Sequence, residues 1–171
     1  MQRHSLKPTP QTLCGSISRY FAPPLTIASG DVVDFELIDS VWHDPAGPNK
    51  DGTWSKLPTV RGDGHALVGP VAIASAKAGQ TLEVQVLELH PGPFGFCAAG
   101  GYASEWNTPL GIDGPNDRTE VVYALDPEMG VARSERGGSI AMRPFLGFMG
   151  LAPAEPGPLA TRPPRRTGGN I

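Results

Sequence analysis

Apolar residues that alternate with polar ones recur along the chain and predict β-strands. In SGDVVDFELIDS, every second residue from Val33 to Leu37 is apolar, and in AGQTLEVQVLEL the same holds from Leu82 to Val86. A period of two is typical of a strand that buries one face, because successive side chains point to opposite sides of a sheet. We therefore expect strands over residues 33–38 and over Thr81–Leu89.

A shorter apolar segment and a turn that contains glycine precede each of these alternating segments. PPLTIAS is followed by Ser29-Gly30-Asp31, and GPVAIAS is followed after a few residues by Ala78-Gly79-Gln80. Glycine suits a left-handed turn position because it has no Cβ to clash. The repeated order of short strand, turn and longer strand predicts two β-hairpins.

The remainder of the chain favours more strands and little helix. Further strands are expected at Thr119–Ala124, around Gly130–Arg133 and at Ser139–Met142, and the apolar segment Phe145–Leu151 is expected to be buried, with its glycines allowing a close backbone approach. The polar stretch Trp42–Gly64 reads as a connection long enough to be functional or mobile. The predicted fold class is mainly β, a hairpin-rich barrel or sandwich.

Composition narrows the class of protein further. The 22 glycines and 19 prolines supply turns between short strands, and 171 residues suit a single domain. Because 14 basic residues face 17 acidic ones, no nucleic-acid partner is expected. We expect no membrane partner either, since no apolar stretch is long enough to span a bilayer, and the N-terminus lacks the apolar core of a signal peptide. These observations predict a cytoplasmic protein.

The two cysteines, Cys14 and Cys97, are expected to remain free thiols in a reducing compartment. Cys97 lies among small residues in FGFCAAGGY, with no neighbouring His or Lys that would lower its pKa. A small buried residue is therefore favoured over a nucleophile at this position.

The segment RGDGHALVGPVAI carries the first candidate chemistry. Asp63 and His65 are flanked by Gly62 and Gly64, immediately before an expected strand. Asp with His can bind a metal or hold a base, and glycines let the backbone approach a ligand. The alternative is a surface turn whose Asp caps the backbone and whose His is solvated.

Two other segments carry polar groups of less specific pattern. The histidine and aspartates of WHDPAGPNKDGTW (His43, Asp44 and Asp51) lack the spacing of a calcium loop and favour a polar surface loop. Glu83 and Glu88 are expected to face solvent.

The C-terminal RPPRRTGGNI is either a disordered basic tail or a site loop. Gly168 and Gly169 would offer unobstructed backbone N–H groups, and the amide of Asn170 can position a carbonyl or ligate a hard cation. No aromatic residues are interleaved for stacking on bases, which weakens a nucleic-acid interpretation.

Taken in order, four segments resemble the acetamidase/formamidase family of amide hydrolases. PPLTIASGDVVDFELID is similar to the opening of that family, and GHALVGPVAIASAKAGQTLEVQVLEL to its Gly-His-x-Leu-Thr-Gly-Pro-Val hairpin, with Val68 in the threonine position and Gln80 in the aspartate position of the following turn. RPFLGFMGLAPAEPG resembles its Arg-Pro-Phe-x-Gly-x-Met-Gly-Val-Ala-Pro segment. RRTGGN resembles its His-Gly-Gly-Asn loop, with Thr167 where the family usually has histidine.

The resemblance covers about residues 20–171 and leaves residues 1–19 as an N-terminal extension. It implies an acetamidase/formamidase-like fold, present as the N-terminal half of the family's length, and hydrolysis of small linear amides of the formamide or acetamide type to ammonia and a carboxylate. It further implies a divalent metal, zinc in particular, with His65 and Asn170 near the metal or substrate. Asp63 and Glu155 are the candidates for ligation or proton transfer, and Gly168 and Gly169 for substrate binding.

Two departures from the family pattern keep an alternative open. Thr167 removes an imidazole, and the family's second half, with a further Gly-Asp-x-His segment, has no counterpart. The alternative is a non-catalytic β-domain or subunit that retains the fold and binds a small molecule or a partner chain. Either reading predicts exposed apolar surface, and hence a homo-oligomer or a complementary chain that carries the C-terminal half.

Overall fold

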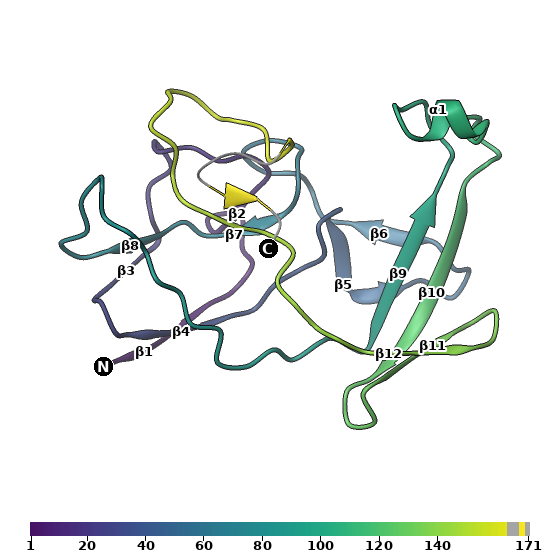
Figure 1. The fold of residues 1–171 in the computed structure, drawn as a ribbon, viewed down its shortest axis with the longest axis horizontal. Helices are drawn as coiled ribbons and strands as arrows, with labels where there is room; N and C mark the ends of the chain where they lie inside the picture. Colours follow the sequence, from purple (N-terminus) through teal and green to yellow (C-terminus); the bar gives the residue numbers. More distant parts are fainter. Residues whose placement is uncertain (164–167, 170–171) are drawn as a thin grey trace. The chain divides into compact units, whose positions relative to one another are not determined.

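The computed structural model describes residues 1–163, 168 and 169 (Figure 1). Among these residues, short strands dominate and one four-residue helix occurs. The elements in chain order are β1 (Arg3–Leu6), β2 (Leu13–Cys14), β3 (Leu25–Ile27), β4 (Val32–Phe35), β5 (His43–Pro48), β6 (Trp54–Lys56), β7 (Leu67–Val68), β8 (Val71–Ile73), β9 (Phe94–Ala99), α1 (Asn107–Leu110), β10 (Thr119–Asp126), β11 (Val131–Ser134), β12 (Ser139–Ala141), β13 (Met149–Gly150) and β14 (Gly168–Gly169). The expectation of a mainly β fold with little helix is confirmed. No helix among the described residues is long and apolar enough to cross a membrane.

The chain forms two compact units. The first comprises residues 1–83 and the C-terminal part from Leu146, and the second comprises Val84–Phe145. The second unit is a four-stranded antiparallel sheet in the order β12-β11-β10-β9, with α1 in the connection between β9 and β10 (Figure 1). The strands predicted at 119–124, 130–133 and 139–142 are β10, β11 and β12 of this sheet.

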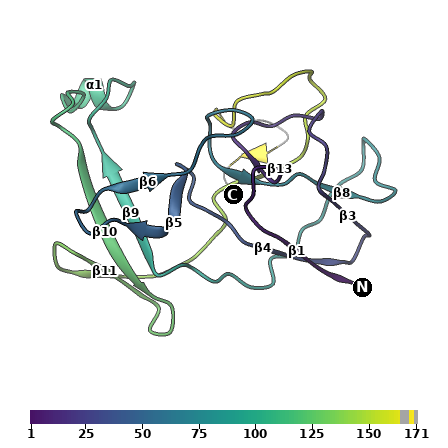
Figure 2. The same ribbon diagram turned by 180° about the vertical axis from the view of Figure 1, so that it is seen from behind.

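The first unit is built from two-stranded ladders, and its pairing differs from the predicted hairpins. β3 pairs in parallel with β8, so that Leu25 lies opposite Val71 and Ile27 opposite Ile73, and the two strands run side by side in Figures 1 and 2. β4 pairs in parallel with β1 of the N-terminal segment. The similar segments PPLTIAS and GPVAIAS therefore pair with each other across the chain, whereas local turns were expected to pair each with its own neighbour.

The glycine turns themselves have the predicted conformation. Gly30 has φ = 86° and Gly79 has φ = 89°. The turns close through hydrogen bonds from Asp31 N–H to Ala28 C=O and from Gln80 N–H to Lys77 C=O. A left-handed turn redirects the chain, but it does not require the flanking strands to pair, which is why the turn prediction is correct and the hairpin prediction is wrong.

The strand predicted over Thr81–Leu89 is absent. Residues 81–90 have no regular secondary structure and are all exposed. The alternating pattern at residues 33–38 forms a strand only as far as Phe35, after which pairing with β1 ends. Alternation of apolar and polar residues indicates that a segment is able to pair as a strand. The described part of the chain supplies no partner strand for Thr81–Leu89.

Burial in the first unit centres on residues 12–18, which lie within the segment expected to be an extension. Six of these seven residues are buried, and Leu13 and Cys14 form β2, which pairs with β7. The apolar segment Phe145–Leu151 was expected to be buried, but Phe145 is 72% exposed and Leu151 is 46% exposed. Cys97 is also exposed, contrary to the prediction, and both cysteines are free thiols as expected.

Candidate functional site

The turn that carries Asp63 and His65 lies against the buried segment around Gly15. Gly15 N–H donates to Val60 C=O at 2.8 Å, and Gly64 N–H donates to Gly15 C=O at 2.9 Å. A Cβ added at Gly15 would collide with the carbonyl of Gly62, and one added at Gly64 would lie 2.6 Å from both Gly15 O and Thr161 Oγ1. The glycines flanking Asp63 are therefore required by a close approach between two backbones.

Arg61 anchors the beginning of this turn. It has a left-handed φ of 52°, and its Nε and Nη2 donate to Leu13 C=O at 3.0 and 2.6 Å while Nη2 also reaches Gln11 C=O at 2.7 Å. The guanidinium lies 5.0 Å from the centroid of the Phe21 ring, a cation–π geometry. A non-glycine residue in a left-handed conformation is strained, and these three hydrogen bonds compensate for that cost.

Two distant segments hold the backbone on either side of His65. Thr161 Oγ1 accepts a hydrogen bond from His65 N–H at 3.0 Å, and Trp42 Nε1 donates to Gly64 C=O at 2.8 Å. Ala66 N–H donates to Ser40 C=O at 3.1 Å. The position of His65 thus depends on residues that are 23 to 96 positions away, as Trp42 and Thr161 show.

The imidazole of His65 is kept neutral and has an unused nitrogen. Burial lowers its pKa below the usual range, and the positive charge of Arg162 lowers it further. Its Nδ1 is buried and has no hydrogen-bond partner among residues 1–163, 168 and 169. A buried neutral imidazole nitrogen without a partner can accept a proton or a hydrogen bond, or ligate a metal.

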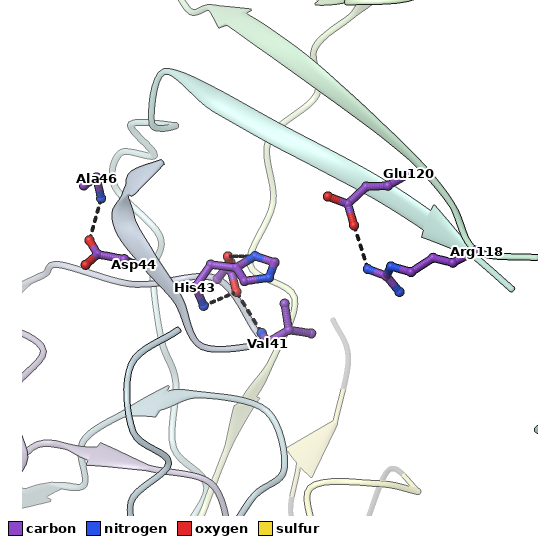
Figure 3. Close-up of polar contacts among 7 residues, drawn as sticks. Val41, His43, Asp44, Ala46, Arg118 and Glu120 are labelled. Atoms are coloured by element: carbon purple, nitrogen blue, oxygen red, sulfur yellow. Dashed lines mark hydrogen bonds and ion pairs between the residues drawn. The ribbon is translucent and has the colours of Figure 1, made fainter. Parts of the chain in front are cut away.

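A second histidine, which the sequence analysis placed in a polar surface loop, is buried. His43 Nδ1 lies 2.9 Å from Asp39 Oδ2, and the other carboxylate oxygen of Asp39 accepts backbone N–H groups of Val41 and His43 (Figure 3). The His43 ring stacks on that of Trp54 at 4.5 Å between centroids. The available sequence signal was the spacing of four residues between Asp39 and His43.

The stretch 42–64, expected to be a long connection, therefore has structure of its own. β5 and β6 form an antiparallel hairpin with a register shift between His43 and Pro48. Trp42 precedes it with φ = 67° and only 3% exposure. In the same unit, this strained and buried Trp42 connects the Asp39–His43 pair with the Gly64–His65 turn through its indole hydrogen bond.

The other predicted site residues occupy less enclosed positions. Asp63 and Glu155 are exposed. Gly168 and Gly169 form β14, which pairs with β13 so that Gly168 lies opposite Gly150, and a Cβ at Gly168 would collide with Gly150 Cα. Asn170 lies outside the described residues. Their assignment to catalysis, substrate binding and metal binding stays a prediction.

The described side chains fit the zinc ion that the family resemblance implies only in part. His65 fits as a ligand, because its imidazole is neutral and its Nδ1 is unpaired within the described chain. A catalytic zinc site needs about three protein ligands. No group of three His, Cys, Asp or Glu side chains that could hold a metal is present among residues 1–163, 168 and 169. The described residues therefore supply one fitting ligand and not a complete site.

Comparisons with known proteins support the fold alone. No family model matches the chain, and no curated protein matches it. The chain is similar to a solved structure, the crystal structure of a recombinant predicted acetamidase/formamidase from the thermophile Thermoanaerobacter tengcongensis. The TM-score is 0.67 and the sequence identity is 20%. The match covers 99% of this chain and 52% of that one, so the chain spans about half the length of the protein it resembles. The chain thus has the fold of an acetamidase/formamidase structure over nearly all of its own length.

Proposed function

We propose that this chain takes part in hydrolysis of small linear amides, of the formamide or acetamide type, to ammonia and a carboxylate. Two observations support this function: the fold resembles that of a predicted acetamidase/formamidase, and the sequence carries segments similar to that family in the same order. The observation that carries the proposal is the state of His65, whose buried Nδ1 has no partner in the described part of the chain.

His65 would hold or orient the reacting group. With its pKa lowered, the imidazole is unprotonated at neutral pH and is available as a metal ligand or a proton acceptor. The hydrogen bonds from its own backbone to Thr161 and from Gly64 to Gly15 fix the position of the backbone that carries the ring. Asp63 is exposed two residues earlier and is the candidate for moving a proton to the leaving ammonia.

A zinc ion, when bound, would polarise the amide carbonyl and lower the pKa of a water molecule. His65 would supply one ligand and Asn170 is the proposed second, although Asn170 lies outside the described residues. Because the described donor set is incomplete, we assign no catalytic step to the metal. The remaining ligands would come from elsewhere in the chain or from a partner chain.

The experiment compares His65→Ala with His90→Ala. His90 is a matched control, because its side chain is 83% exposed and pairs with the exposed carboxylate of Glu88. Ammonia release from formamide and from acetamide is measured with and without added zinc, together with the zinc content of the purified protein. We expect His65→Ala to lose zinc and turnover while His90→Ala retains both. Equal zinc content and turnover in the two variants would reject the role of His65.

A non-catalytic subunit is the second candidate. The sequence feature that favours it is Thr167, which stands where the family usually has histidine. In that case the wild-type protein releases no ammonia even with zinc loaded, yet a small amide still raises its thermal stability through binding. That combination of results would replace the enzyme proposal with a binding function.

A further inference from the structure

Two of the three non-glycine residues that have a left-handed backbone in the described chain belong to the surroundings of His65. Arg61 has φ = 52° and Trp42 has φ = 67°, while the third, Ser75, lies in a turn after β8. Such strained residues persist only where their surroundings hold them, and they cluster at functional sites. Arg61 begins the turn that carries His65, and Trp42 reaches the same turn through its indole hydrogen bond to Gly64. The strain is thus concentrated around one candidate functional group.

The residue Arg61 is bonded in both directions to the segment 11–16. Its guanidinium donates to two backbone carbonyls of that segment, those of Gln11 and Leu13. In return, the hydroxyl of Ser16 donates to the backbone carbonyl of Arg61. Leu13 and Ser16 are buried, so water does not readily replace the bonds that they make. The N-terminal segment therefore supports the residue at which the turn begins.

We propose that Arg61 is a positioning residue for the imidazole of His65, with the segment 11–16 as its support. The inference rests on the proposed role of His65 in amide hydrolysis. Two glycines lie between the two residues, and glycine has more backbone freedom than any other residue. A turn with this freedom needs an anchor at each end to keep a side chain in one place. Arg61 is the anchor at the start of the turn, and the hydrogen bond from His65 N–H to Thr161 is the anchor at its end.

The chemistry of arginine suits this role. A guanidinium presents several N–H donors in a rigid fork, so one side chain bonds more than one acceptor at fixed angles. In Arg61, Nε and Nη2 both donate to Leu13 C=O, and Nη2 also donates to Gln11 C=O. The contact with the Phe21 ring, 5.0 Å from the guanidinium to the ring centroid, adds a further constraint on the fork. The side chain thus restrains both the place and the direction of the backbone from which it extends.

The test is NMR spectroscopy of the full chain, in which the imidazole C–H signals of its four histidines are followed in a proton–carbon correlation spectrum. His65→Gln assigns the signal of His65. We expect Arg61→Ala to shift and broaden this signal, because the ring then samples several positions. The signals of His4 and His90 should stay unchanged, which separates loss of positioning from general unfolding. This readout needs neither metal nor catalysis.

Arg19→Ala is the matched control. Arg19 also donates to a backbone carbonyl, that of Ala154 at 2.7 Å, and also lies over an aromatic ring, that of Tyr20 at 5.1 Å. Both partners lie outside the turn that carries His65, so Arg19→Ala should leave the His65 signal unchanged. Arg61→Gly keeps the test decisive if the alanine variant folds poorly, because glycine adopts φ = 52° without strain and still lacks the guanidinium. Circular dichroism checks that the variants fold.

A second readout connects the position of the ring with the reaction. In ammonia release from formamide with zinc added, we expect Arg61→Gly to lower kcat by about tenfold or more while KM changes by less than about threefold, because a misplaced reacting group costs turnover rather than substrate binding. Arg19→Ala should retain both constants. If the wild type releases no ammonia, the amidase proposal fails, while the NMR comparison still decides whether Arg61 positions the ring.

Three outcomes would overturn the proposal. A His65 signal that is unchanged in both Arg61 variants would mean that the turn keeps its place without the guanidinium. An equal change of that signal in Arg19→Ala would mean that any loosening of the first unit reaches the ring. An active wild type whose Arg61 variants retain kcat would mean that the position set by Arg61 does not matter for the reaction.

Discussion

The backbone amide of His65 donates a hydrogen bond to the hydroxyl of Thr161 at 3.0 Å, across 96 positions of sequence. Thr161 is 3% exposed, so the bond lies where water does not readily replace it. The C-terminal segment thereby becomes part of the turn that presents the His65 imidazole. Residues before and after the second unit must both be in place for this site to exist.

Replacing Thr161 by valine should destabilise the first unit. Valine retains the shape but removes the acceptor, and a buried amide left without a partner costs about 1–3 kcal/mol. Thr161→Ser keeps the hydroxyl and serves as the control, with a smaller loss from the missing methyl group. Urea denaturation measures the free energy of unfolding of both. Equal stability of the two variants would show that the hydroxyl does not hold His65.

Gly64→Ala should be destabilising for a different reason, the lack of room. The added Cβ would lie 2.6 Å from Gly15 O and from Thr161 Oγ1, and overpacking of this kind costs about 1–3 kcal/mol. Gly147→Ala is the matched control, because its Cβ would meet nothing within 4 Å. Thermal denaturation should show a lowered midpoint for Gly64→Ala alone. A midpoint unchanged in both would contradict the close approach of the two backbones.

Trp42→Phe should loosen the same turn from its other side. Phenylalanine has no N–H to offer the carbonyl of Gly64, and the buried site would lose part of its packing as well, together about 1–3 kcal/mol. Trp106→Phe is the comparison, since Trp106 is 73% exposed and its replacement should change stability by less than about 0.5 kcal/mol. Chemical denaturation followed by circular dichroism measures the free energy of unfolding of both variants. Equal stability of the two would contradict the predicted role of the Trp42 indole.

The half-buried His65 predicts a pH dependence of stability. Its pKa is lowered in the folded state, so below the unfolded value of 6.5 the unfolded chain binds more protons than the folded one. Stability should therefore fall as the pH decreases from about 7 through that value, and level off once the folded imidazole is also protonated.

The measurement is the difference between wild type and His65→Gln in denaturation midpoint from pH 8 to pH 4. Taking the difference removes the contributions of the other histidines. The variant should lose less stability than the wild type on acidification. Parallel curves would mean that the imidazole of His65 titrates normally in the folded protein.

The turns and several strands could be predicted from the sequence because their signals are local. Glycine at positions 30 and 79 adopts the left-handed conformation that its lack of a Cβ permits, and β10 to β12 follow the expected segments. The glycines beside His65 marked it as a candidate, and its role stays a prediction. The resemblance to acetamidases and formamidases was readable from four short segments in order, and the match of folds agrees with it.

What the sequence by itself determined was therefore conformational preference: where the chain turns, which segments are able to form strands, and that helices are scarce. The tertiary structure alone decided which segments pair. β3 joins β8 in parallel, while Thr81–Leu89, with the clearest alternation, stays unpaired in the described chain. It also decided that His43 and Trp42 are buried and that Thr161 holds His65. The physical reason is that pairing and burial depend on which other segments of the chain pack against a given segment. A local pattern of residues reflects only the conformational preference of that segment itself.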